Sequence, residues 1–224
     1  MYLRIMSLAI RTEADLAKLV GQAADRLGLE IQTIQEEFLR DSDEYLSLAA
    51  VRSRNDQLVT YPIVAHEFHR DRLMTYPAKL DLEQCGKLQR FVNEEIKREK
   101  MYGPNIFIFD LQGELIRVQR GITYEAIWSE VFALTSIFEN VVRGELNLPL
   151  GTSELIEEDW LVANFDAPLN LDMKHPYLHL FAHEPRYRVL KLTSHKGFIA
   201  LSRRVNLKAE VIHAIDYLEG VINE

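Results

Sequence analysis

The sequence predicts a mixed α/β (α+β) fold, in which an antiparallel sheet packs against helices and a small β-rich domain follows. Strand-like segments often come in consecutive pairs joined by turn residues, as at 54–56 and 112–113, which is typical of hairpins. Helical periodicity is confined to a few separate segments. Strands and helices do not alternate regularly, so the pattern does not indicate a parallel βαβ array.

The first 80 residues predict a strand–helix start followed by antiparallel strands. A short strand at 8–10 leads to Thr12, whose hydroxyl can cap a helix that Gly28 ends. Apolar residues recur at helical spacing along one face of this helix. Further strands are expected at 31–38, 45–52, 57–64 and 73–76.

The rest of the chain predicts two more helices, a hairpin and a β-rich end. The expected helices cover 81–99 and 135–143, and Asn206 can cap a third, last helix. The expected strands are 105–110, 114–119, 161–165, 177–182, 186–193 and 198–202. We predict three units, residues 1–38, 39–152 and 153–224.

Composition excludes some classes of function. Of the 224 residues, 47% are hydrophobic, and the formal net charge is −8, which suits a packed core and not a duplex-binding surface. No apolar run reaches the ~18 residues of a membrane helix. The single cysteine, Cys85, cannot form an internal disulfide, which suits a cytoplasmic protein. From the charge and the absence of a long apolar run, we expect binding to neither nucleic acid nor membrane.

An ordered set of motifs is the most specific feature of the chain. It consists of Tyr61-Pro62, His69-Arg70-Asp71, Thr135-Ser136-Ile137-Phe138-Glu139 and the segment 148–155. In this order the motifs resemble the PurK-type ATP-grasp ligases, the 5-(carboxyamino)imidazole ribonucleotide synthetases. The resemblance runs from about Ile10 to Ser202 and corresponds to the C-terminal half to two-thirds of a family member. It implies ATP-dependent carboxylation of aminoimidazole ribonucleotide in purine synthesis as the family activity.

The resemblance also implies candidate binding residues. Glu36-Glu37-Phe38 looks like the hinge that receives the adenosine, with Glu44 close behind, although a solvated acidic strand end is the alternative. In the loop His69-Arg70-Asp71, Arg70 could bind an anionic ligand. A salt bridge between Arg70 and Asp71 is the alternative that we favour. The segment with Lys191, His195 and Lys196 lies where the family has a basic, phosphate-facing stretch.

Three departures from the family pattern argue against catalysis. Leu3 to Leu8 contains no glycine or lysine of a phosphate-covering loop. Ile106 and the pair Val118-Gln119 stand where the resemblance places the magnesium carboxylates, and Mg²⁺ prefers anionic oxygen ligands. Residues 121–127 replace a substrate-contacting loop. We therefore expect no cofactor, with ATP and magnesium as the disfavoured alternative.

The histidines and the cysteine do not indicate a metal site or a nucleophile. His66-Glu67-Phe68-His69 is one residue short of the helical His-Glu-x-x-His motif. The histidines at 175, 179 and 183 are four apart but fall on a predicted strand, where they would lie well separated. Cys85 has no evident histidine partner.

These observations lead to a PurK-like homologue that is catalytically inactive alone and acts as a binding or regulatory pseudoenzyme. Two alternatives stay open. The chain could be one half of a split ATP-grasp ligase, or a structural or oligomerisation module. A protein partner or self-association is expected in each case.

Overall fold

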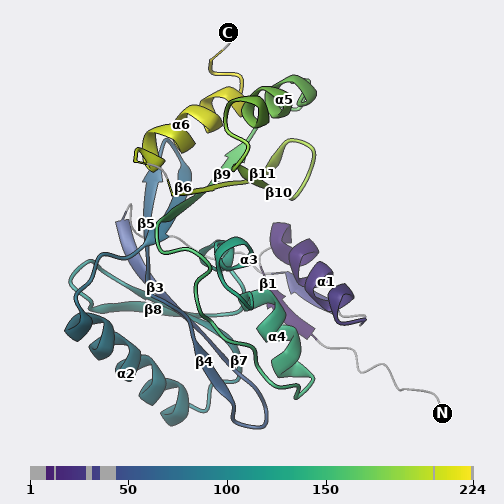
Figure 1. The fold of residues 1–224 in the computed structure, drawn as a ribbon. Helices are drawn as coiled ribbons and strands as arrows, with labels where there is room; N and C mark the ends of the chain where they lie inside the picture. Colours follow the sequence, from purple (N-terminus) through teal and green to yellow (C-terminus); the bar gives the residue numbers. More distant parts are fainter. Residues whose placement is uncertain (1–8, 13, 29–31, 36–43, 204, 223–224) are drawn as a thin grey trace, which may run out of the picture.

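The computed structural model describes residues 9–12, 14–28, 32–35, 44–203 and 205–222. Two sheets and six α-helices make up the described part of the chain, and Figure 1 shows their arrangement. A small parallel pair consists of β1 (Ala9–Thr12) and β2 (Gln32–Gln35). None of the described helices is both long and apolar enough to cross a lipid bilayer.

The main sheet has nine strands, and all its pairings are antiparallel. Along the sheet the order is β10-β11-β9-β6-β5-β3-β7-β8, and β4 pairs separately with β3. This sheet confirms the predicted mixed α/β class. The strands are β3 (Glu44–Arg52), β4 (Leu58–Thr60), β5 (Val64–His69), β6 (Arg72–Pro77), β7 (Gly103–Phe109), β8 (Leu115–Arg120), β9 (Trp160–Asp166), β10 (Arg188–Lys191) and β11 (Lys196–Ser202).

Helices cover both faces of this sheet. On the outer face lie α2 (Leu82–Arg98), α5 (Lys174–His183) and α6 (Leu207–Leu218), and on the inner face lie α1 (Ala17–Arg26), α3 (Ser129–Phe132) and α4 (Ile137–Glu145) (Figure 1). Short 3-10 turns at Ala14–Leu16 and Tyr124–Ala126 precede α1 and α3. The inner face carries the largest hydrophobic cluster.

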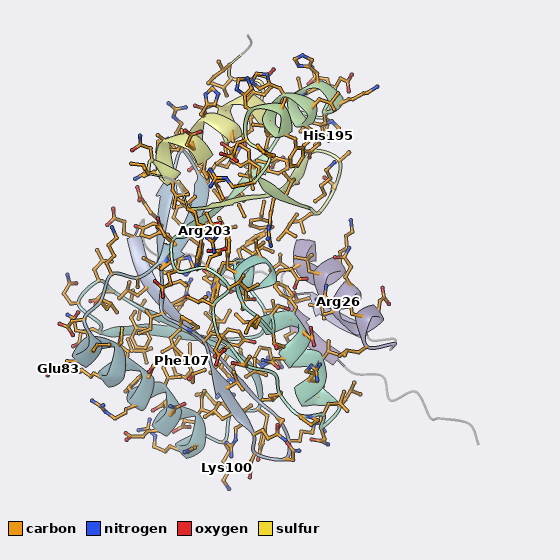
Figure 2. The ribbon with its side chains drawn as sticks, in the orientation of Figure 1. Arg26, Glu83, Lys100, Phe107, His195 and Arg203 are labelled. Carbon is orange, nitrogen blue, oxygen red and sulfur yellow. The ribbon has the colours of Figure 1, made fainter. Side chains whose placement is uncertain are left out.

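Local signals in the sequence fix α2 and α4. Asp81 accepts a hydrogen bond from the Gln84 amide at 2.8 Å, and the Gln84 side chain returns the bond in a capping box. Ser136 caps α4 with a single bond, which its hydroxyl accepts from the Glu139 N–H at 3.2 Å. Phe107, on the outer face of the sheet, is fully buried in the hydrophobic cluster that α2 covers. Glu83 in α2 and Lys100 just after it are exposed to solvent (Figure 2).

The prediction of a strand at 177–182 is wrong, because these residues lie within α5. Pro176 is the third residue of this helix, where its missing N–H would have no helical partner in any case. The side chains of Pro176 and Leu180 are buried. The sequence pattern at 177–182 fits a strand or a helix, and packing against α6 favours the helix.

Two other boundaries differ from the prediction. The expected strand 57–64 is broken, because Pro62 cannot donate to a ladder and β5 begins only at Val64. Thr12 is buried at the end of β1 and the helix starts two residues later, at Ala14. Asn206 does precede α6, but its side chain makes no capping hydrogen bond.

A buried hydrogen-bond cluster joins three of the four motifs that define the sequence pattern, those at Tyr61-Pro62, 135–139 and 148–155. The hydroxyl of Tyr61 donates to the carbonyl of Thr135 at 3.0 Å and accepts from the Asn140 amide at 2.7 Å. Asn140 also accepts from the Gly151 N–H at 2.7 Å and donates to its carbonyl at 3.0 Å. Burial raises the pKa of Tyr61, so it stays a neutral donor. These contacts give Tyr61, Thr135, Asn140 and Gly151 a structural role.

Candidate functional site

The inner face of β7 and β8 brings together the two positions at which the resemblance expects magnesium carboxylates. Ile106 and Gln119 are direct cross-strand partners, so their side chains share this face. Ile106 is fully buried in the hydrophobic cluster. Val118 lies on the other face, packed against the α2 side.

The residues present do not fit a magnesium ion. With its amide oriented to satisfy its neighbours, the side-chain oxygen of Gln119 accepts from Nε and Nη2 of Arg117 at 3.1 and 2.9 Å. An aliphatic group, a neutral amide and a guanidinium therefore occupy the site. Mg²⁺ requires hard oxygen ligands in a near-octahedral set, and a neighbouring cation opposes its binding.

A buried carboxylate lies over the same face of the sheet, beside β3. Glu125 is only 2% exposed and accepts a hydrogen bond from the Tyr45 hydroxyl at 2.7 Å and a second from the Thr123 hydroxyl. It comes from residues 121–127, which the resemblance aligns with a substrate-contacting loop. A carboxylate of this kind needs a compensating charge to remain buried.

His66 supplies that charge. Its ring stacks on Tyr45 at 4.7 Å, and its two nitrogens face the hydroxyls of Ser47 at 2.7 Å and Thr75 at 2.9 Å. Because a hydroxyl can accept from either nitrogen, the ring can be held as an imidazolium. Burial alone would raise the pKa of Glu125, but the charge of His66 and the hydrogen bonds to the carboxylate outweigh burial and lower that pKa.

The candidate adenosine contacts lie mostly outside the described residues. Glu36, Glu37 and Phe38 belong to this part of the chain and stay a prediction. Glu44 is described and exposed, at the start of β3. The pKa of Tyr76 is raised, mainly by burial and to a smaller extent by the negative charges of Glu67 and Glu44.

The loop His69-Arg70-Asp71 forms the tight turn between β5 and β6. Arg70 and Asp71 both have positive φ, 47° and 64°, as the central residues of a type I′ turn do. The expected salt bridge between them is wrong, because Arg70 instead pairs with Asp216 of α6 at 3.2 Å. The turn is docked on α6, and this contact is sufficient to explain Arg70.

The basic segment around β10 is engaged with its own neighbours. The Lys191 amine lies 3.7 Å from the centre of the Tyr177 ring, and His195 makes a hydrogen bond of 3.0 Å with the Leu171 carbonyl. Lys196 pairs with Asp166 at 2.9 Å. Figure 2 labels His195 on the hairpin that joins β10 to β11. A role of Lys191 and His195 in phosphate binding stays a prediction.

The histidines of α5 lie on one helix, contrary to the predicted strand. The rings of His179 and His183 are 4.2 Å apart, and His179 stacks on Tyr217 at 4.0 Å. Among the described residues, no three histidine, cysteine or acidic side chains form a group that could hold a metal ion.

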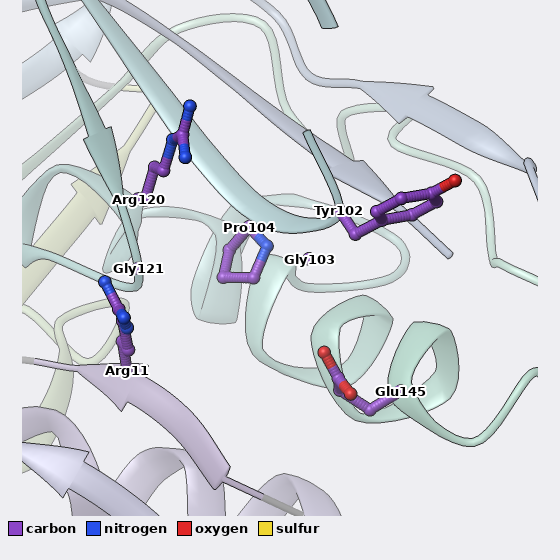
Figure 3. Close-up of a pocket in the computed structure, with 7 residues that line it drawn as sticks. All are labelled: Arg11, Tyr102, Gly103, Pro104, Arg120, Gly121 and Glu145. Carbon is purple, nitrogen blue, oxygen red and sulfur yellow. The ribbon is translucent and has the colours of Figure 1, made fainter. Parts of the chain in front are cut away.

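A pocket opens where β1, β7 and β8 end against α4 (Figure 3). Arg11 and Arg120 lie on one side of it, and Glu145 and Tyr102 on the other. Its volume is about 230 Å³. Sequence reasoning missed this pocket and the Glu125 network, because no motif links segments so far apart in the chain.

The sheet and its helices form a partial PurK-like ATP-grasp fold. No protein-family model and no curated protein matches the chain. Solved structures do: N5-carboxyaminoimidazole ribonucleotide synthetase from Thermus thermophilus is 20% identical, with a TM-score of 0.61 over 84% of this chain and 53% of that one.

Two further structures show how widely this fold is shared. The N5-carboxyaminoimidazole synthase from Aspergillus clavatus, solved with ADP and 5-aminoimidazole ribonucleotide, has a TM-score of 0.65 and 14% identity over 83% of this chain and 53% of that one. A glycinamide-RNase-transformylase T from Mycobacterium tuberculosis has a TM-score of 0.62 and 14% identity over 84% and 53%. The chain thus spans about half the length of these proteins, which differ in name and share the fold.

Proposed function

We propose that this chain is a PurK-like ATP-grasp homologue that does not carry out ATP-dependent carboxylation alone and acts as a binding or regulatory pseudoenzyme. The observation that carries the proposal is the pairing of Ile106 with Gln119 next to Arg117. Phosphoryl transfer depends on metal ions that neutralise the phosphate charge. At the positions where the resemblance expects two carboxylates, these side chains supply no negative charge.

The Glu125 network supports the same proposal. Its carboxylate accepts from Tyr45 and Thr123 and is balanced by His66, so its lone pairs are used within the core. An acidic group in this state stabilises the fold and is a poor ligand for an incoming metal–nucleotide complex, because binding would break the buried pair.

The direct test is a turnover assay on the purified chain with ATP, magnesium, bicarbonate and aminoimidazole ribonucleotide. We expect no phosphate release above the protein-free rate. Turnover near the enzyme median of about 10 per second would refute the proposal. Calorimetric titration with ATP, with and without magnesium, is the second readout: any affinity should not depend on the metal, and tight binding that requires magnesium would count against the proposal.

The proposal includes a protein partner or self-association, in the cytoplasm. Support comes from β8, which ends the main sheet and carries exposed Leu115 and Ile116 next to exposed Leu111. We expect sedimentation to show association that Ile116→Lys weakens. Leu82→Lys is the matched control, because Leu82 is a single exposed side chain at the start of α2. A wild-type chain that neither associates with itself nor captures a partner would contradict this part.

A further inference from the structure

We propose that the pocket between Arg11, Arg120 and Glu145 binds a small oxyanion, the phosphate or carboxylate group of a metabolite. The inference goes beyond the function proposed above, since an anion can bind here whether or not the chain turns over ATP. It rests on the backbone that builds the pocket, the charges that line it and its size.

The backbone holds the two arginines next to each other. The N–H of Gly121 donates to the Pro104 carbonyl at 3.1 Å, and the N–H of Ile122 donates to the Arg11 carbonyl at 2.8 Å. The end of β8 is thus tied to both β7 and β1. Arg120 immediately precedes these contacts, so its side chain and that of Arg11 flank Gly121 at the mouth of the pocket (Figure 3).

Glycine keeps the floor of the pocket open. Gly103 has φ of +73°, a conformation that favours glycine, and a Cβ there would lie 3.6 Å from Oε1 of Glu145. A larger side chain would extend into the space between β7 and α4.

The charge of the pocket is opposite to that of the chain. The net charge of the protein is −8, yet two arginines and one glutamate line this pocket. Glu145 is already paired with Arg54 at 3.1 Å. Within the described part of the chain, no salt bridge or side-chain hydrogen bond involves Arg120. An oxyanion in this pocket would give the Arg120 guanidinium charge-assisted hydrogen bonds, next to the second arginine, Arg11.

The size of the pocket suits a small ligand group. At about 230 Å³ it lies below the 300–1,000 Å³ that is usual for drug-sized ligands. A phosphate or a short carboxylate fits within this volume. The acidic side at Glu145 opposes a second anionic group, so we expect one anionic end of the ligand to sit at the arginines.

The experiment is calorimetric titration with inorganic phosphate, succinate and glycerol phosphate, against potassium chloride at the same ionic strength. We expect all three oxyanions to bind and chloride not to bind. Equal affinities for phosphate and glycerol phosphate would mean that the pocket recognises the free or esterified anion alike. Tighter binding of glycerol phosphate than of phosphate would indicate that the pocket also contacts the glycerol part. Heats no larger than those of chloride for all three would overturn the proposal.

Three variants assign the binding to this pocket. Arg120→Gln should weaken phosphate binding about tenfold or more, the usual worth of a charged hydrogen bond. Arg90→Gln, an exposed arginine on α2 across the sheet, should leave it unchanged. Glu145→Gln should tighten it, because it removes the one carboxylate among the lining residues. Circular dichroism checks that each variant is folded. Equal losses in Arg120→Gln and Arg90→Gln would show general screening and refute the site.

Discussion

Replacing Gly151 by alanine tests the cluster that joins the sequence motifs. A Cβ at this position would lie 2.1 Å from Oγ1 of Thr135, 2.6 Å from its Cγ2 and 2.7 Å from its Cβ. Rotation of Thr135 moves the first two atoms and leaves the third in place. Relief therefore needs a backbone shift, and the backbone is held by the bonds between Gly151 and Asn140.

The structure sets the size of the effect. Overpacking of a rigid core costs about 3 kcal/mol at the upper end, and weakening one hydrogen bond adds about 1 kcal/mol. A loss of about 4 kcal/mol is a large share of the 5–15 kcal/mol that stabilises an ordinary domain. With a urea m-value of about 2–3 kcal/mol/M, the midpoint of unfolding should fall by about 1.5 M.

Urea unfolding can be followed by tryptophan fluorescence, because Trp128 and Trp160 are buried and stacked at 5.2 Å. Gly21→Ala is the control: no atom lies within 4 Å of its Cβ position, and alanine in a helix should stabilise by up to about 1 kcal/mol. In the Gly151→Ala background, Thr135→Gly should restore stability and Thr135→Ala should not. A midpoint within error of wild type for Gly151→Ala, or equal rescue by both second changes, would refute the reasoning.

Three further variants test the Glu125 network, the turn between β5 and β6, and the hydrogen bonds of Tyr61. Glu125→Gln should destabilise by about 3 kcal/mol or more, since it leaves the charge of His66 buried without its partner. Because the folded pKa of Glu125 is lowered, its stabilisation is complete above the unfolded pKa of about 4.3 and is lost as pH falls through the folded value. The urea midpoints of wild type and Glu125→Gln should converge over that range, and a constant difference would contradict the assignment. Arg70→Ala should cost at most about 1 kcal/mol, because its pair with Asp216 is exposed, and should leave phosphate titration unchanged. Tyr61→Phe should cost about 1–3 kcal/mol in urea unfolding, and no loss would show that its two hydrogen bonds are weak.

The parts of the fold that depend on local signals could be predicted from the sequence. Asp81 and the apolar residues Leu88, Val92 and Ile96 define α2 to within a residue, because a cap and a stripe are properties of adjacent turns. Apart from 57–64, which is divided between β4 and β5, and 177–182, which is helical, the predicted strands of the main sheet were found in order. The boundaries failed where tertiary packing decides, as in α5, whose helix is selected by contact with α6.

The candidate site could be predicted only where a motif marks it. The positions of Ile106 and Gln119 followed from the family resemblance, and the structure places them opposite each other. The Glu125 network could not be anticipated, because its partner Tyr45 is 80 residues away in the chain. Arg11 and Arg120 likewise meet only through the pairing of strand ends, which single-sequence periodicity does not reveal.

The pairing of β6 with β9 has a consequence for any attempt to shorten the protein. Met74 and Thr75 pair with Ala163 and Val162, so β9 continues the sheet from β6. A fragment that stops at residue 152 would keep the pairing of β6 with β5 but would lose the pairing of Met74 and Thr75 with β9, and Met74 would lose its cover. Such a fragment should form strand-to-strand aggregates upon expression. The last third of the chain therefore protects the rest against self-templated assembly.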